Sequence, residues 1–219
     1  MTGTTFARLL AVVSLLLVTP AAVRADQVDE IAGAIRQGDI ATIRTLVTTS
    51  EASNQRLDSL GTTPLRLAVI RGERHIVSYL LQRGADIGER DSLGMSVLSA
   101  AVRSCRSGVD VIEMLIDAGA DLENRSGAGN TPLMVAILGA RPDVARLLIE
   151  HGADVAALNQ YGDGVINMAI RSRMPEILAL AVVGGAPAAQ LKVLFKEYYY
   201  YFPNFGRARS FAMPGACGD

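Results

Sequence analysis

Side chains that bind metals or perform nucleophilic and redox chemistry are scarce in this chain of 219 residues. It contains no Trp, two Cys and two His, and only two of its 21 basic residues are Lys. His75 and His151 lie far apart in the sequence, as do Cys105 and Cys217, so neither pair has the spacing of a metal-binding motif. We therefore expect no metal and no other cofactor.

Catalytic motifs are missing as well. The sequence has no G-x-S-x-G motif and no H-E-x-x-H motif. Gly127-Ala128-Gly129 superficially resembles a nucleotide-binding loop, but no long strand precedes it. The formal net charge of -1 gives no reason to expect binding to nucleic acid. We predict no catalytic residues and a chain that is not an enzyme.

A long apolar run occurs only at the N-terminus, in residues 1–25. Arg8 supplies one positive charge, residues 9–18 are almost entirely Leu, Val and Ala, and small residues lead to Ala25. This pattern is typical of a secretory signal peptide, and we predict cleavage after Ala25. An uncleaved anchor is the alternative, although the run is shorter than the ~20 apolar residues that a membrane span needs. We expect the mature chain in the periplasm or outside the cell, meeting the membrane only during export.

The two cysteines allow one covalent link. In an oxidising compartment, Cys105 and Cys217 are able to form a disulfide that ties the C-terminal tail to the middle of the chain. Two independent thiols are the alternative.

Short phrases recur about every 33 residues. Gly61-Thr62-Thr63-Pro64-Leu65 returns as Gly129-Asn130-Thr131-Pro132-Leu133, and in weaker form at 94–98 and 162–166. A second phrase, Gly84-Ala85-Asp86-Ile87, returns at 119–122, at 152–155 and in part at 185–187. A fixed period of this length predicts a stacked array of small units, none of which buries its apolar face alone.

Each position of the second unit has a physical reason. Thr63 is able to cap a helix, as is Thr131 in the phrase at 129–133, and Pro64 suits the first helical turn. Gly72 suits the left-handed end of that helix. The apolar residues at 76, 77, 80 and 81 have the spacing of one buried face of a second helix. Small residues are expected where neighbouring helices approach closely: Ala68, Ala101, Ala136 and Ala169.

These motifs resemble the ankyrin repeat, most specifically at 63–68, 131–136 and the Gly-Ala-Asp phrases, and the resemblance covers roughly residues 28–188. It implies an all-α fold, an ankyrin-repeat solenoid of stacked antiparallel helix pairs with short β-turn or hairpin loops. It also implies a non-enzymatic protein-binding module, which we expect to be of the bacterial exported type and monomeric.

The period divides the chain after the signal peptide into seven segments. We expect an N-terminal capping repeat (26–57, repeat 1), repeats at 58–90, 91–125 and 126–158 (repeats 2–4), a degenerate repeat at 159–189 (repeat 5), a C-terminal capping helix at 190–203 and a flexible tail at 204–219. Repeat 3 contains two additional residues, which we place in 104–108 between its helices. Ala140 and Arg173 occupy the places where Gly72 stands in repeat 2, and Gly164 replaces the capping threonine in repeat 5.

The resemblance implies that partners contact the hairpin tips and the exposed side of each first helix. Apolar and arginine residues alternate at these positions, which is typical of binding hot spots. The predicted partner-binding residues are Leu60, Arg66, Arg71, Arg90, Leu93, Met95, Arg103, Tyr161 and Arg171. We expect a concave groove for a protein segment with acidic and apolar groups, and ordinary surface scatter is the alternative.

Three classes of function remain open. The leading one is an exported scaffold or inhibitor that binds a protein partner. The others are an accessory factor for a redox or cofactor-dependent periplasmic enzyme, in which the cysteines or Tyr198–Tyr201 take part, and a secreted effector that acts on host proteins.

Overall fold

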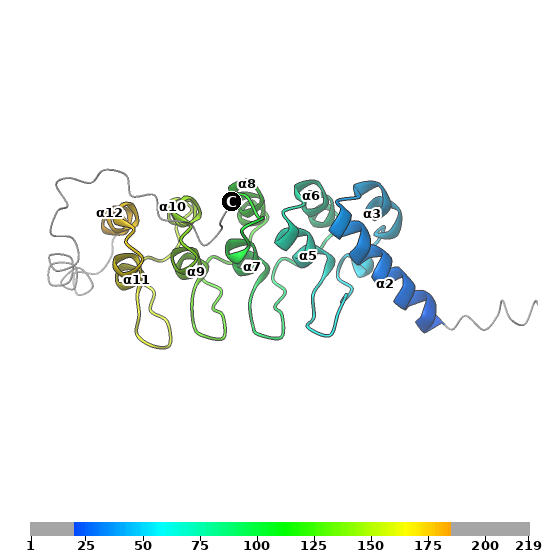
Figure 1. Cartoon of the computed structure of the whole chain (residues 1–219), viewed down its shortest axis with the longest axis horizontal. Helices are drawn as coiled ribbons and strands as arrows, with labels where there is room; N and C mark the ends of the chain where they lie inside the picture. The colour runs from blue at the N-terminus through cyan, green and yellow to red at the C-terminus, as the bar shows by residue number, and fades with distance from the viewer. Residues whose placement is uncertain (1–19, 185–219) are drawn as a thin grey trace, which may run out of the picture.

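The computed structural model describes residues 20–184 as a row of helix pairs (Figure 1). Within this range the only strand-like contacts are two isolated bridges, Arg90 with Ser96 and Leu158 with Gly164. The predicted all-α class is confirmed. The helices are α2 (Pro20–Gln37), α3 (Ile40–Leu46), α4 (Ser50–Ser53), α5 (Pro64–Arg71), α6 (Arg74–Gln82), α7 (Val97–Arg103), α8 (Val109–Asp117), α9 (Pro132–Leu138), α10 (Pro142–Glu150), α11 (Val165–Arg171) and α12 (Pro175–Val183).

The helices form two layers, from which loops project on one side (Figure 1). We call α5, α7, α9 and α11 the inner helices, because they lie next to the loops, and α6, α8, α10 and α12 the outer helices. Each inner helix contacts the inner helix of the next repeat, and the outer helices do the same. Helix α2 packs on α5 and α3 packs on α6, so repeat 1 closes the N-terminal end of the row.

Side-chain caps start three of the inner helices, as the sequence predicts for two of them. The Thr63 hydroxyl accepts a hydrogen bond from the Arg66 amide at 3.2 Å, and the Thr131 hydroxyl accepts one from the Met134 amide at 3.4 Å. Ser96 caps α7 in the same way. Gly164 has no side chain to offer, so α11 begins without such a bond. Because glycine is itself tolerated at a helix N-cap, the missing side-chain bond typically costs only about a few tenths of a kcal/mol.

The turn between inner and outer helix requires a left-handed residue in three repeats. Gly72 has φ of 75°. Ala140 and Arg173 have φ of 52° and 54°, although neither is glycine. The sequence alignment of these two residues with Gly72 is thereby confirmed. A left-handed residue with a Cβ atom costs roughly 1–2 kcal/mol, so repeats 4 and 5 hold strained turns that packing must stabilise.

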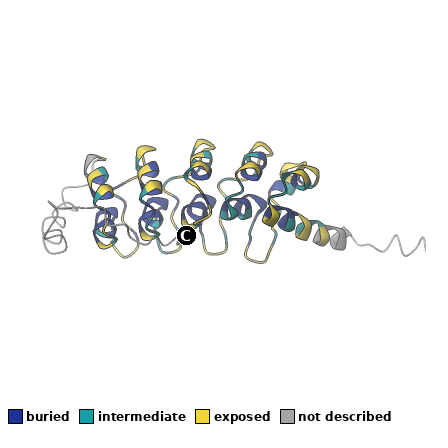
Figure 2. Cartoon of the chain, turned by 45° about the horizontal axis from the view of Figure 1, so that its top comes forward, coloured by how far each residue is buried: buried dark blue, intermediate teal, exposed yellow. Residues whose placement is uncertain are grey.

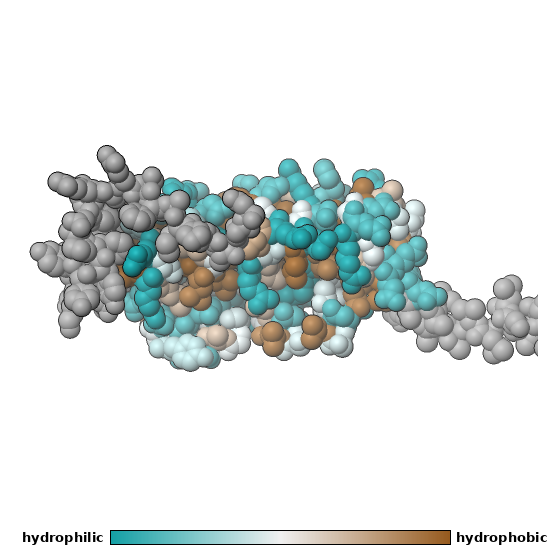
Figure 3. All heavy atoms as spheres, viewed as in Figure 1, coloured by the Kyte–Doolittle hydropathy of each residue, from teal (hydrophilic) through white to brown (hydrophobic). Residues whose placement is uncertain are grey.

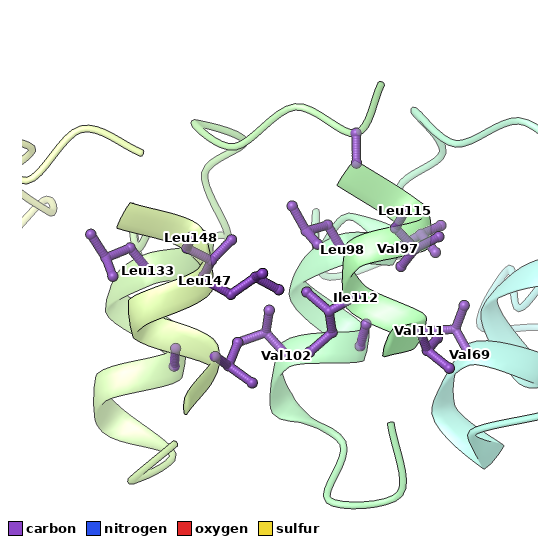
Figure 4. Packing of buried hydrophobic residues seen from close by; sticks show 14 of the residues in the cluster. Val69, Val97, Leu98, Val102, Val111, Ile112, Leu115, Leu133, Leu147 and Leu148 are labelled. Atoms are coloured by element: carbon purple, nitrogen blue, oxygen red, sulfur yellow. The ribbon is translucent and has the colours of Figure 1, made fainter. Parts of the chain in front are cut away.

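One continuous core connects the layers (Figure 2). The small residues predicted for close helix approach, Ala68, Ala101, Ala136 and Ala169, are fully buried. Between repeats 3 and 4, Ile112 of α8 and Leu147 of α10 extend toward each other (Figure 4). Exposed residues lie mainly on the outward surfaces of the outer helices and on the loops. Each repeat thus completes its core with its neighbours.

The two additional residues of repeat 3 fall between α7 and α8, as predicted, and residues 104–108 pack on repeat 2. The Ser104 hydroxyl donates to the Ile70 carbonyl at 2.7 Å, and the Ser107 hydroxyl donates to the Val69 carbonyl. A Cβ atom on Gly72 would lie 2.2 Å from the Arg106 carbonyl oxygen. We call residues 104–108 the insertion.

Several predicted segments lie outside the described residues. Residues 1–19, most of the predicted signal peptide, are among them, and α2 already includes the predicted cleavage position at Ala25. The predicted capping helix at 190–203, the tail at 204–219 and Cys217 are also outside, so the Cys105–Cys217 pair stays a prediction. Among the described residues, no helix has both the length and the apolar character needed to cross a membrane.

Candidate protein-binding face

The hairpin tips are organised by a short polar side chain three residues before the tip glycine. The Asp58 carboxylate accepts hydrogen bonds from the Leu60 and Thr62 amides, both at 2.9 Å. Asp91 repeats this arrangement in repeat 3. The Asn159 side-chain oxygen repeats it in repeat 5. These residues were not predicted from the sequence, although each stands three residues before a tip glycine, Gly61, Gly94 or Gly162, and Asp and Asn commonly form such turns.

These bonds have a pH dependence at the first tip. The hydrogen bond from the Thr62 amide lowers the pKa of the Asp58 carboxyl below its ordinary value, against a smaller opposing effect of burial. The ionised carboxylate therefore stabilises the folded tip above the ordinary pKa. This stabilisation is lost as the pH falls through the lowered one.

Apolar side chains stand at the tips that these turns hold. The residue before the tip glycine is Leu60, Leu93, Ala128 or Tyr161 in repeats 2 to 5. Leu60 is 63% exposed, Leu93 68% and Tyr161 74%, whereas Ala128 is half-buried. Figure 3 shows hydrophobic residues at the lower edge of the molecule, where Figure 1 places the loops before α5 and α7. Leu60, Leu93 and Tyr161 are therefore exposed at the hairpin tips, and their role in partner binding stays a prediction.

Large exposed hydrophobic side chains are confined to one side of the described structure. Besides the three tip residues, they are Leu138, at the end of α9, and Leu158, at the base of the last hairpin. Within residues 26–181, the outer helices carry none. A surface that concentrates apolar side chains on one face is typical of an interaction site. We call the hairpin tips together with the exposed side of the inner helices the inner face.

Two predicted partner-binding residues are buried, and the prediction that they face a partner is corrected. Arg66 is 2% exposed and its guanidinium pairs with Glu89 at 2.8 Å and with Asp91 at 3.3 Å. It also donates to the Met95 carbonyl at 2.6 Å. Met95 itself is 9% exposed. Arg66 points into the neighbouring hairpin, where two carboxylates and a carbonyl satisfy it, so it connects repeats 2 and 3.

The environment of Glu89 follows from this burial. Burial raises the pKa of the Glu89 carboxyl above its ordinary value, although the Arg66 charge opposes the shift. Both side chains of the Arg66–Glu89 pair are largely buried, so the pair is a structural link and not a contact surface. Removal of one partner would leave the other as an uncompensated buried charge.

Most of the other predicted arginines have partners within the chain. The Arg71 guanidinium donates to the Arg36 carbonyl at 3.0 Å, and Arg171 pairs with Asp163. Arg90 is exposed but donates to the Arg125 carbonyl at 3.2 Å. Arg103 is also exposed, and among the described residues no hydrogen bond or ion pair of its guanidinium is found. The inner face therefore has fewer available arginines than the sequence suggests.

Two sets of hydrogen bonds between neighbouring repeats, made by Arg125 and Arg141, were not predicted from the sequence. Arg125 continues the arrangement of Arg90 by donating to the Leu158 carbonyl, so the same position in successive repeats forms a ladder. Arg141 is 9% exposed, and its guanidinium donates to four carbonyls at the end of α7 and in the insertion, those of Ala101, Val102, Ser104 and Ser107. Burial lowers the pKa of Arg141, against the opposing charge of Asp143.

The carboxylates that recur once per repeat organise the loops that follow the outer helices. Asp86, Asp121 and Asp154 each accept a hydrogen bond from the amide two residues later, at 2.9, 2.9 and 2.8 Å.

The His151 ring nitrogen Nδ1 lies 2.8 Å from the Leu147 carbonyl oxygen at the end of α10. In the described part of the chain, no three His, Cys, Asp or Glu residues are placed to hold a metal ion.

Comparison with known families agrees with this geometry. The family model "Ankyrin repeats (3 copies)" matches residues 31–126 and, overlapping, residues 98–184. These matches cover more than half of the chain, and the chain belongs to the ankyrin-repeat family. The fold and the predicted ankyrin resemblance are confirmed.

Curated relatives match a smaller part of the chain. Protein phosphatase 1 regulatory subunit 27 is 41% identical in the human form and 40% in the mouse form, in each case over 99 residues, which is 45% of this chain and 62% of the relative. The mouse protein fem-1 homolog A-like is 34% identical over 76 residues, 35% of this chain and 11% of the relative. The chain thus spans less than two thirds of the curated relatives it matches. All three are animal proteins, and they give no support to the expected bacterial type.

Proposed function

We propose that this chain is a non-enzymatic protein-interaction module, a scaffold or inhibitor that binds a protein partner through its inner face. The observation that carries this proposal is that, within the described structure, large exposed hydrophobic side chains lie only at the hairpin tips, at the base of the last hairpin and on α9. The family and the similarity to a regulatory subunit also favour a binding role without catalysis. Side-chain hydrogen bonds fix the backbone of the turns that carry Leu60, Leu93 and Tyr161, so we expect little ordering of these turns when a partner binds.

Substitution of Leu60, Leu93 and Tyr161 together by Ser is expected to weaken partner binding by about tenfold or more, because apolar anchors dominate interfaces of this kind. The measurement is affinity capture with the chain as bait, followed by titration of the captured partner. Circular dichroism should show unchanged helicity, since the three side chains are exposed. The control replaces His75, Glu113 and Arg146, exposed residues on three outer helices, by Ser. Equal binding by both variants would contradict the proposal.

A second candidate is binding to a protein phosphatase. The similarity to the regulatory subunits of protein phosphatase 1, over 45% of this chain, favours it. The same two triple variants test it when the purified catalytic subunit of protein phosphatase 1 is the probe. Binding that the tip variant loses and the control retains would support this candidate, and absence of binding to the wild-type chain would reject it.

We propose in addition that the chain is exported and acts in the periplasm or outside the cell. The basic start, the apolar run and the small residues before Asp26 support this. The intact mass of the chain recovered from producing cells is expected to correspond to residues 26–219. A mass that includes residues 1–25 would indicate an uncleaved anchor or no export.

A further inference from the structure

One row of residues crosses the four inner helices at the same depth. It consists of the seventh residue after each helix cap: Ile70, Arg103, Leu138 and Arg171 on α5, α7, α9 and α11. Because each of these helices contacts the next, the side chains of the row are neighbours across the repeats. Ile70 is half-buried, Leu138 is 57% exposed, and both arginines are exposed.

Arg103 has apolar neighbours on both sides. One helical turn before the row, on the same side of each helix, stand Leu67, Ala100 and Val135. Leu67 and Val135 are half-buried and Ala100 is buried. Figure 3 shows hydrophobic residues over α5 and over α9, with hydrophilic residues between them. A charged group that binds here is therefore surrounded by apolar surface.

Arg103 differs from the other inner-helix arginines because its charge is not paired within the described residues. Arg66 is paired with Glu89 and Asp91, Arg71 donates to a carbonyl, and Arg171 is paired with Asp163. A partner's carboxylate can thus bind Arg103 without displacing a contact that the described structure already makes.

Charge is divided between the two layers. The inner helices contain these four arginines and no acidic residue. The outer helices contain two arginines and six acidic residues: Asp110, Glu113, Asp117, Asp143, Glu150 and Glu176. Because Arg66, Arg71 and Arg171 already have partners among the described residues, the available positive charge of the inner helices is that of Arg103. An acidic group is therefore attracted to Arg103 and repelled by the acidic outer helices.

We infer that Arg103 determines the specificity of the inner face, and that the partner segment presents a carboxylate flanked on both sides by apolar side chains. The carboxylate pairs with the Arg103 guanidinium, while the apolar side chains cover Ile70 and Leu138 and exclude water from the pair. Such a pair favours the matching partner and penalises a neutral or basic one, because the arginine would then be desolvated without compensation. This inference rests on the proposed function.

The experiment begins with selection of random 12-residue peptides, displayed on phage, against the full chain. We expect the selected peptides to share an Asp or Glu with apolar residues on either side. One such peptide, fluorescently labelled, is then titrated with wild-type and variant chains by fluorescence polarisation. Arg103→Ala is expected to weaken binding about tenfold or more. Arg146→Ala removes the same charge from the exposed surface of α10 and is expected to leave the affinity unchanged.

A charge exchange completes the test. Replacement of the peptide's acidic residue by Lys should abolish binding to the wild type, and Arg103→Glu should restore it. Peptides without acidic residues, or an affinity that Arg103→Ala does not change, would overturn the inference. If the selected peptides do not depend on Arg103 but their binding still requires Leu60, Leu93 and Tyr161, the proposed function stands and only the role of Arg103 is rejected. Recovery of no binding peptide at all would count against both.

Discussion

Replacement of Arg141 by Met is expected to destabilise the protein by about 3 kcal/mol, although residue 141 lies on the loop before α10 and outside the binding face. The wild-type guanidinium donates to the carbonyls of Ala101, Val102, Ser104 and Ser107, three of them at 3.1 Å or less. Met fills much of the same volume but donates nothing. Buried carbonyls at the end of α7 and in the insertion would then lose their charged partner.

Urea denaturation followed by circular dichroism measures this effect as a lower transition midpoint. Arg141→Lys should lie between Met and the wild type, because an ammonium group keeps the charge but lacks the planar fork that reaches several carbonyls at once. Arg146→Met, on the exposed surface of α10, is the matched control and should change the free energy of unfolding by less than ~0.5 kcal/mol. A loss in Arg141→Met no larger than in this control would contradict the assigned role.

Replacement of Gly72 by Ala is expected to destabilise the protein by roughly 2–5 kcal/mol, for two separable reasons. Gly72 has φ of 75°, which a residue with a Cβ atom adopts at a cost. The new Cβ atom would also lie 2.2 Å from the Arg106 carbonyl oxygen. Since this oxygen belongs to the backbone, the insertion itself must shift.

Gly162→Ala separates the two contributions. Gly162 has φ of 76°, nearly the same as Gly72, and no atom lies within 4 Å of the Cβ position. Only the conformational cost of roughly 1–2 kcal/mol then applies. Thermal unfolding of both variants should show the larger decrease in Tm for Gly72→Ala. Equal decreases would mean that the insertion moves away from the new methyl group at little cost.

Local rules predicted the repeated unit well. The caps Thr63 and Thr131, the turn at Gly72 and the alignment of Ala140 and Arg173 with it depend on backbone conformation and on neighbours a few residues away. The position of the insertion followed from the repeat spacing alone. These features could be predicted from the sequence because the same residue types recur at the same positions in successive repeats.

Contacts between repeats were harder to predict. Arg66 was expected at the surface because its position on the first helix is commonly exposed, yet Glu89 and Asp91 of the next hairpin bury it. Arg125 and Arg141 bind backbone carbonyls, which every residue type carries, so no sequence pattern indicates their partners. Whether an arginine side chain faces a partner or links two repeats depends on how neighbouring repeats pack against each other. A single sequence does not contain this information.

The insertion also changes how the row of repeats should come apart. In a simple array each unit is stabilised only by its nearest neighbours, and opening can begin at any junction. Here the segment 104–108 holds the end of α5 through Ser104 and Ser107, while Arg141 from repeat 4 holds the same segment from the other side. We therefore expect repeats 2, 3 and 4 to unfold as one cooperative unit, with partial opening beginning at the two ends of the row.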